Sequence, residues 1–470
     1  MTRLVTLAAL VALVADAHAN GRPPATSSIQ FRKGAEQHIA AGMTFGLLLS
    51  DDGGATWYWM CEKAVNYAAT YDPSYSYTVS GALFATTFSP GLAVRRIPPA
   101  GDGCTFNEVA VGSGSGIFVS KDTLGSNDHF YAAAADSTDA KIYESSDDGV
   151  TFPQSTGPGM NGDWWDALIV APSDATRVYL SGYRFVSMQP KVFELFKSVN
   201  GGASFTPLTV NICSTTVTTN CFHVSQNSAV DIIAVSPTDP NVIYARSTLE
   251  NGTAGDGIYL STDGGTTWTD MLHAPSATTH GVPDSLYLVA RRNGTVVVGS
   301  QNAGSYVNTT PTTTPTAWTQ LTSPPHINCL VENSAGEVWA CTQNYGVPGV
   351  PSDGFGMMKT TDLSTWIGVL RFQDIVAPVS CPAGTNQQDM CVAPYMGMAS
   401  FWCVLRVQLG ITATGGVDCP SFLTDSPADS TIIKPGKGCC DAGDGAGAPL
   451  AVGAFLAVVL LRPRRRKLAV

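Results

Sequence analysis

Residues 50–57, with the sequence SDDGGATW, decide the fold because their pattern S-x-[DN]-x-G-x-[TS]-[WF] recurs along the chain. Full copies stand at 145–152 (SSDDGVTF), 198–205 (SVNGGASF) and 261–268 (STDGGTTW). A weaker copy at 360–366 (TTDLSTW) is one residue shorter and lacks the glycine. A motif that returns in this way indicates a fold assembled from repeated units, each with the same turn.

The chemistry of the octapeptide is that of a tight turn between two strands. Its Asp or Asn side chain can accept hydrogen bonds from backbone N–H groups further along the turn, and its glycine allows a positive φ. The last residue is aromatic and can fold under the turn into the core. We therefore predict structural roles in turns for Asp52, Asp147, Asn200 and Asp263.

A second repeat precedes some of the octapeptides. Residues 166–180 (DALIVAPSDATRVYL) match residues 231–245 (DIIAVSPTDPNVIYA), and residues 284–291 resemble the first part of this repeat. Each copy predicts an inner strand, a Pro/Asp turn and a second strand. The recurring order of strand, turn, strand and octapeptide predicts four-stranded antiparallel sheets.

The spacing of the octapeptides predicts the number of sheets. The copies begin at positions 50, 145, 198, 261 and 360, and the first and last intervals are near twice the length of one unit. Each long interval should hide a degenerate unit, at 92–106 and 305–318. The result is an all-β propeller of seven blades, with six or eight as alternatives. An N-terminal strand near 29–31 or 38–42 should complete the last sheet and close the ring.

At these turns the chain resembles the Asp-box, or BNR, repeat of sialidases, sortilin-type receptors, xyloglucanases and photosystem assembly factors. The resemblance implies a propeller. It also implies that the box Asp and Asn residues lie on the blade periphery, away from the ligand face and without catalytic or calcium-binding roles. The alternative fold, a sandwich of two sheets, also has many short strands but does not explain a turn that recurs at blade spacing.

The two ends of the chain predict export. Residues 1–19 have the charged, apolar and small-residue parts of a secretory signal peptide. The propeller is expected in residues 20–380, followed by a Cys-rich closing segment (381–419) and a linker (420–438). An apolar stretch with an Arg-rich end then completes the tail at 439–470. A short single-pass membrane helix with its basic end in the cytoplasm is one explanation of this order.

The tail also resembles the myxobacterial C-terminal sorting signal, which combines a Cys motif, a short helix (here 446–461) and an Arg cluster. The resemblance implies a sorting protease and a membrane as partners of the tail, with Cys439 and Cys440 as the sorting or lipidation site. It also implies the cell surface or outer membrane of a Gram-negative, myxobacterial-type bacterium. Whether the helix is retained or cleaved stays open.

Charge and cysteine content limit the partners. The formal net charge of −11 repels phosphate backbones and disfavours nucleic acid. Ten of the twelve cysteines precede the tail, and an even number in an exported chain favours disulfides. The pairs Cys213/Cys221 and Cys329/Cys341 are near enough to staple hairpins, whereas pairing among the last four stays open. Without C-x-x-C pairs, and with scattered histidines, the sequence predicts no metal site and no cofactor.

Catalytic signatures are incomplete. Sialidases share an Arg triad whose first member lies in an F/Y-R-I-P motif, and residues 31–34 (FRKG) and 95–98 (RRIP) each retain only part of it. Another kind of glycosidase needs two carboxylates about 5 to 9.5 Å apart. Asp166, Asp231 and Asp284 begin predicted inner strands, so they could converge on the axial face or bond backbone amides at the strand starts.

The most suggestive segment is 162–166 (GDWWD). Indoles beside carboxylates suit a sugar, which presents C–H groups to an aromatic face and hydroxyls to acids. We predict ligand binding by Asp163, Trp164 and Trp165, although strand alternation turns only one indole outward and core packing is the alternative. The sequence favours a surface binding or scaffold module for a glycan, an envelope polymer or a protein, with a secreted glycoside hydrolase as the alternative.

Overall fold

The computed structural model describes residues 23–420, which form a propeller and a C-terminal segment packed on it. The predicted signal peptide (1–19) and the predicted sorting tail with Cys439 and Cys440 lie outside the described residues. Within the described part of the chain, no helix is both long and apolar enough to cross a membrane. The description has gaps at 67–71, 88–92, 112–117, 127, 136–139, 154–156, 161, 186–190, 225–227, 249–254, 275–284, 348 and 395–398.

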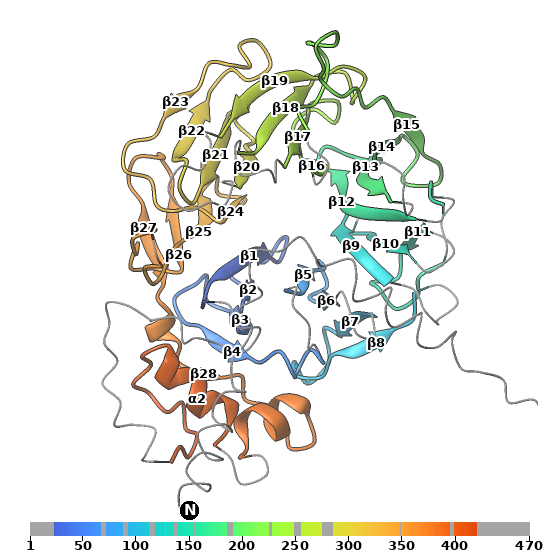
Figure 1. Ribbon diagram of the computed structural model, residues 1–470. Coiled ribbons are helices and arrows are strands. Elements are labelled where there is room, and N and C mark those ends of the chain that lie inside the picture. The colour runs from blue at the N-terminus through green and yellow to red at the C-terminus, as the bar shows by residue number, and fades with distance from the viewer. Residues whose placement is uncertain are drawn as a thin grey trace, which may run out of the picture. The chain divides into compact units, whose positions relative to one another are not determined.

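Seven sheets surround a central axis as the blades of a propeller, and each blade uses strands that are consecutive in the sequence (Figure 1). The strands of blades 1 to 3 are β1 (Thr26–Phe31), β2 (Ile39–Met43), β3 (Gly46–Ser50) and β4 (Tyr58–Met60); β5 (Ser74–Tyr77), β6 (Leu83–Thr87), β7 (Ala93–Ile97) and β8 (Asn107–Val109); β9 (Phe118–Leu124), β10 (Phe130–Ala135) and β11 (Ala140–Ser145).

The remaining four blades each have four antiparallel strands. Their strands are β12 (Asp163–Ala171), β13 (Asp174–Arg184), β14 (Val192–Ser198) and β15 (Thr206–Leu208); β16 (Val230–Val235), β17 (Ile243–Ser247), β18 (Gly257–Ser261) and β19 (Thr269–His273); β20 (Leu286–Ala290), β21 (Val296–Ser300), β22 (Ser305–Asn308) and β23 (Thr319–Gln320); β24 (Cys329–Glu332), β25 (Val338–Cys341), β26 (Met357–Thr360) and β27 (Ile367–Leu370).

The predicted seven-bladed, all-β fold is confirmed. The four full octapeptides and the shortened copy each follow the third strand of a blade, as the turn that leads outward. The degenerate units at 92–106 and 305–318 supply the corresponding strands and turns of blades 2 and 6. In blade 3 the described residues form three strands, and the Glu144 N–H donates to the Pro153 carbonyl where a fourth strand would pair.

Hydrogen bonds within the octapeptide fix the shape of the turn. In the first copy, Ser50 Oγ accepts from the Gly54 N–H at 2.9 Å. Asp52 Oδ1 accepts from the Thr56 N–H at 2.9 Å, and Oδ2 accepts from the Thr56 hydroxyl at 2.7 Å. The Trp57 side chain folds under the turn, is 2 % exposed, and donates from Nε1 to the Gly54 carbonyl. The side chains of Ser50 and Asp52 thus accept from three donors of the turn.

The other copies repeat these bonds. Asp147, Asn200 and Asp263 each accept through Oδ1 from the N–H four residues further on, at 2.9 Å in all three turns. In the shortened copy, Asp362 Oδ1 accepts at 2.8 Å from the N–H groups of both Ser364 and Thr365. The side chain at this position therefore organises the turn whether it is an aspartate or an asparagine.

The glycine at the fifth position of the turn lies against the preceding blade. Gly149 has φ +75°, and a Cβ there would lie 2.1 Å from Phe84 of blade 2. Gly265 has φ +92°, and a Cβ there would lie 2.4 Å from Leu208 of blade 4. At Gly149 and Gly265, glycine is therefore required by both the left-handed backbone and the close approach of the neighbouring blade, whereas a Cβ at Gly202 would lie 3.4 Å from Tyr131.

The predicted closure of the ring is wrong. The segments at 29–31 and 38–42 form β1 and β2, which pair with each other and with β3 inside blade 1. Four strands from one continuous stretch already complete that blade, so none is left for blade 7. The two blades instead meet side by side, where Thr26 Oγ1 donates to the Gly356 carbonyl at 2.9 Å and the rings of Phe31 and Trp339 are 5.1 Å apart.

The C-terminal segment covers the outer edge of blade 1. Its short strand β28 (Ala377–Pro378) pairs in parallel with β4. Gln387 accepts from the Cys61 N–H at 2.9 Å and donates to the Trp59 carbonyl at 3.0 Å, and the Trp402 ring lies 5.6 Å from the Trp59 ring. The helical elements of the segment are η2 (Phe372–Asp374), η3 (Gln387–Val392) and α2 (Phe401–Gln408).

Five disulfides join the ten cysteines of the described residues. The two predicted hairpin staples, Cys213–Cys221 and Cys329–Cys341, are confirmed. The structure also resolves the pairing that the sequence left open: Cys61–Cys391 and Cys104–Cys381 tie the C-terminal segment to blades 1 and 2, and Cys403–Cys419 lies within the segment. The last strand and helices are thereby linked covalently to the first two blades.

We expect Asp52→Ala to lower the free energy of unfolding by roughly 1–2 kcal/mol, because it leaves turn donors without their acceptor. Asp52→Asn should cost less, since Asn200 performs the same role in blade 4. Hydrogen bonds from Thr56 hold the Asp52 pKa at about 2, so this stabilisation is present above about pH 4 and is lost as the pH falls toward 2. Measured by denaturant unfolding between pH 2 and pH 5, the free energy of unfolding should change less with pH in Asp52→Asn than in the unmodified protein. An equal change in both proteins would contradict the assignment.

Removing Cys61–Cys391 should destabilise the protein more than removing Cys213–Cys221. With Cys104–Cys381 intact, the first bond closes a loop of roughly fifty residues, for which the chain-entropy relation gives about 4 kcal/mol. The second closes a loop with a sequence separation of 8, for which it gives about 2.5 kcal/mol. Paired Cys→Ser variants compared by denaturant unfolding test this order, and a larger loss for the short loop would refute it.

Candidate functional site

The strand order defines two faces of the propeller. Because successive strands of a blade run antiparallel, the octapeptide turns lie on the same face as the turns that join first and second strands. The opposite face, here called the loop face, carries the connections from second to third strands and from blade to blade. Every inner strand begins on the loop face, and β12 and β16 are neighbours around the central axis (Figure 1).

The segment predicted to bind ligand stands at the loop-face end of β12. Asp163 is the first residue of this strand and is buried, Trp164 is 37 % exposed, and Trp165 is 2 % exposed. The Trp165 ring packs edge-on against Phe196, with 6.0 Å between ring centroids. The structure therefore turns one indole outward and places the other in the core of the blade.

Trp164 begins a row of aromatic residues across blade 4. Trp164 is opposite Tyr183 of β13, and Tyr183 is opposite Phe193 of β14, so the three side chains share one face of the sheet. The Lys191 ammonium lies 4.1 Å from the Tyr183 ring centroid and donates to the Ser228 carbonyl at 2.7 Å, just before blade 5. The row is therefore fixed at the junction of blades 4 and 5.

An ionic cluster of one buried and two half-buried side chains lies on the face of the blade 4 sheet opposite Trp164. Arg184 Nε donates to Asp163 Oδ1 at 2.6 Å, and the same guanidinium donates to Glu194 on β14. Asp163 Oδ2 also accepts from the Met160 N–H at 2.7 Å. Burial and the negative charge of Asp163 raise the pKa of Glu194 to about 7. At neutral pH this carboxyl is therefore protonated in a large fraction of molecules, as a proton donor in catalysis would be.

Blade 5 contains a second cluster in which one arginine lies between two acidic side chains. Arg246 Nη2 lies 3.7 Å from Asp231 Oδ2, and Arg246 Nε lies 3.7 Å from Asp256 Oδ2. Arg246 also donates to the Leu286 carbonyl of blade 6 at 3.1 Å. Both carboxylates are buried, so the predicted candidate Asp231 faces an arginine of its own blade.

The three carboxylates predicted at strand starts have different surroundings. Trp165 pairs with Gly182 and Ala167 with Ser181, so Asp166 is the extra residue of a β-bulge and is half-buried. Asp231 is instead in a regular pair with Arg246, although the two aspartates align in the sequence repeat. Asp284 lies outside the described residues. Bulges redirect side chains and are frequent beside active sites, which keeps Asp166 a candidate.

The aromatic row supplies one part of a carbohydrate site, because an exposed indole can cover the C–H face of a pyranose. The Asp163–Arg184–Glu194 cluster lies on the other face of the sheet and joins the strands that hold this indole. The catalytic alternative is more demanding because it needs two carboxylates that both reach the substrate. The Asp163 side chain is fully buried and held by Arg184, whereas the Glu194 side chain is 10 % exposed.

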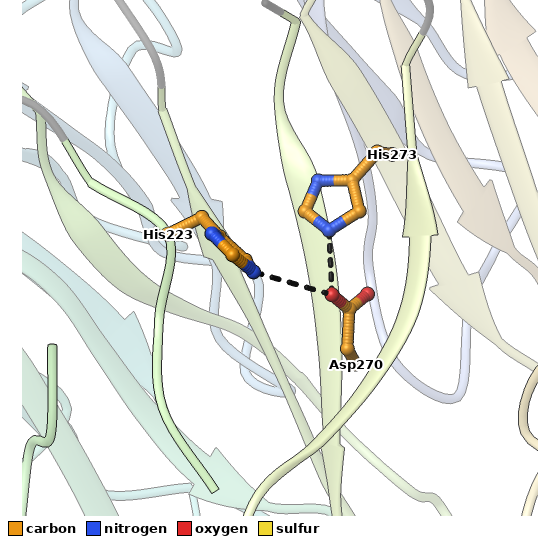
Figure 2. Close-up of side chains that lie close together, drawn as sticks. All are labelled: His223, Asp270 and His273. Carbon is orange, nitrogen blue, oxygen red and sulfur yellow. Dashed lines mark hydrogen bonds and ion pairs between the residues drawn. The ribbon is translucent and has the colours of Figure 1, made fainter. Parts of the chain in front are cut away.

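The sequence did not indicate the residues that complete this site. Arg184 ends β13, beyond the second repeat, and Glu194 belongs to β14, and no pattern in the sequence signals that they meet. The sequence also gave no sign of a further cluster at blade 5, formed by His223, Asp270 and His273 (Figure 2). His223 is far in sequence from the other two residues, which belong to β19.

A groove of about 410 Å³ lies between blades 6 and 7. Its lining includes Arg291 and Asp362, which stand in turns on the face opposite the loop face, together with Gln320 and several threonines. The groove is separate from the Trp164 row, and its lining lacks an aromatic side chain. It therefore offers no stacking surface for a sugar.

Comparisons with known proteins leave the family open. The chain matches no protein-family model. A segment is 26% identical over 152 residues to a probable oligoxyloglucan-reducing end-specific xyloglucanase of Neosartorya fischeri, covering 31% of this chain and 16% of that protein. Solved structures similar to it include YCF48 from Cyanidioschyzon merolae (12% identity, TM-score 0.41, 67% of this chain and 92% of that chain) and the Dos1 propeller (11%, 0.42, 73% and 93%). The chain is a seven-bladed β-propeller by its own sheet order.

The raised pKa of Glu194 predicts a pH dependence of stability. The ordinary glutamate pKa is near 4.3, so between about pH 4.5 and pH 7 the folded protein binds more protons at this site than the unfolded chain, and its stability falls as the pH rises. Glu194→Gln should remove this contribution. The free energy of unfolding of the variant, relative to that of the unmodified protein, should therefore change by roughly 1–3 kcal/mol between pH 4.5 and pH 7. Denaturant unfolding from pH 4.5 to pH 8 measures it, and parallel curves would contradict the assignment.

Proposed function

We propose that this protein is an exported β-propeller of the Asp-box type that binds a glycan at the junction of blades 4 and 5 on the loop face. The observation that carries the proposal is the exposed indole of Trp164 on strands that the Asp163–Arg184–Glu194 cluster ties together from the other face of the sheet. A stacking surface that is held rigid loses little entropy on binding, which favours recognition of a weakly binding sugar.

Export and anchoring are further parts of the proposal. Five disulfides suit a protein that folds in an oxidising compartment, as does the signal peptide predicted at 1–19. In this account the predicted tail, with Cys439 and Cys440, is recognised by a sorting protease and retains the propeller at the outer surface of a Gram-negative cell. The propeller then presents its loop face to external polymers or to the envelope.

A glycoside hydrolase is the second candidate function. It is favoured by the partial match to a xyloglucanase and by the pKa of Glu194, which suits a general acid. The second carboxylate of such a hydrolase would be Asp166, at the bulge of β12. The binding proposal is preferred because Asp163 and Asp231 are both committed to arginines within their blades.

Glycan binding is tested with the purified protein on an array that includes xyloglucan oligosaccharides. Trp164→Ala should weaken binding of the best glycan by about tenfold, because the stacking surface is lost. Phe401→Ala is the matched control, since this aromatic residue is 39 % exposed but lies at the start of α2. Its affinity should equal that of the unmodified protein.

Three outcomes would oppose the binding proposal. Absence of any bound glycan would remove it, as would an equal effect of the two aromatic substitutions. Release of reducing sugar from the bound oligosaccharide that disappears in Asp166→Asn or Glu194→Gln would establish the hydrolase instead.

A further inference from the structure

Three side chains with metal-binding atoms meet on the outer part of blade 5 (Figure 2). Asp270 and His273 belong to β19, and His223 belongs to the connection between β15 and β16. His273 Nε2 lies 2.6 Å from Asp270 Oδ2, and His223 Nε2 lies 4.0 Å from the same oxygen. One ligand atom from each residue lies within 4.8 Å of the other two.

A β-bulge brings two of these residues to one side of the strand. Side chains three positions apart in a regular strand point to opposite faces. In β19, however, Asp270 pairs with Tyr259 while Leu272 pairs with Ile258, which leaves Met271 as the extra residue. The Met271 side chain is buried, and its carbonyl accepts from Trp318 Nε1 of blade 6 at 3.0 Å.

The third residue is held in place before any ligand arrives. His223 follows Phe222, which is fully buried, with its ring 5.2 Å from Trp268 and 4.7 Å from Tyr259. The His223 N–H donates to Tyr259 Oη at 2.9 Å. The disulfide Cys213–Cys221 closes the same connection. The backbone at His223 is therefore fixed relative to blade 5, and only its side chain has to adjust.

The opposite strand leaves room for the His273 ring. Gly257 of β18 is paired with His273, and a Cβ at Gly257 would lie 2.7 Å from Cε1 and 2.8 Å from Nδ1 of that ring. All three side chains are also accessible, with exposed fractions of 55 % for His223, 42 % for Asp270 and 38 % for His273. An ion from solution can therefore reach all three.

We propose that His223, Asp270 and His273 bind one divalent transition-metal ion, with Zn²⁺ as the preferred occupant. Two imidazoles and a carboxylate are a donor set that suits Zn²⁺, and water completes the coordination. Ligand atoms bound at about 2.0–2.1 Å around a tetrahedral ion are roughly 3.3 Å apart, so small side-chain rotations suffice. The net charge of −11 favours cations over anions near the protein. The ion would clamp the disulfide-closed connection to β19.

The test uses untagged protein treated with a chelator and then titrated with Zn²⁺ in a calorimeter. The expected result is saturation at one ion per chain, with binding weakened at least about tenfold in His273→Ala and in His223→Ala. His223→Ala is informative because it leaves the His273–Asp270 hydrogen bond intact. His326→Ala is the matched control: His326 pairs with Asp353 at 2.8 Å, and the described residues add no third ligand there.

Cobalt substitution gives an independent reading. Co²⁺ bound in a tetrahedral site should show visible d–d absorption that is lost in His273→Ala and retained in His326→Ala. Thermal unfolding without metal should be similar for His223→Ala, His273→Ala and the unmodified protein, because these two side chains are exposed. The proposal is overturned if the unmodified protein shows no saturable Zn²⁺ binding, or if His326→Ala weakens binding as much as His273→Ala does.

Discussion

The contact between each octapeptide turn and the preceding blade is the constraint on which the propeller depends. A turn closed by a serine hydroxyl and an Asp or Asn side chain brings its fifth-position glycine against a neighbouring side chain, as Gly149 does against Phe84 and Gly265 against Leu208. Because the full turn recurs in blades 1, 3, 4 and 5, contacts of this kind help to set the spacing between neighbouring sheets. The ring then closes through packing between blades 1 and 7, without a strand shared between them.

Because these inter-blade contacts lie on the face of the octapeptide turns, the loop face can differ from blade to blade. The octapeptides stand on one face and the starts of the inner strands on the other, so changes in the loop-face connections leave the inter-blade contacts intact. Blade 4 uses that freedom to extend β13 to 11 residues and to expose Trp164 on strands joined by an ionic cluster on their other face. Blade 5 uses it for a disulfide-closed connection that brings His223 to β19.

The sequence predicted what short-range chemistry determines. The octapeptide pattern specifies its own hydrogen bonds, so blade number and turn positions followed from it. The two hairpin disulfides followed from the short spacing of their cysteines. Contacts between distant segments could not be predicted. Ring closure depends on where the first blade begins, and the Arg184–Glu194 contact depends on the length of two strands. The bulge at Met271, which unites Asp270 with His273, changes the face of a side chain without any signal in the spacing.

The contribution of the contact between the octapeptide glycine and the preceding blade is measured most directly by comparing Gly149→Ala with Gly53→Ala in denaturant unfolding. The two glycines have nearly equal φ angles of +75° and +74°, so backbone strain from a Cβ should be similar, at about 1–2 kcal/mol. Only Gly149 lies against another blade, since a Cβ at Gly53 would meet no atom within 4 Å. The account predicts an additional loss of roughly 1–3 kcal/mol for Gly149→Ala from overpacking between blades. Equal losses for the two variants would contradict it.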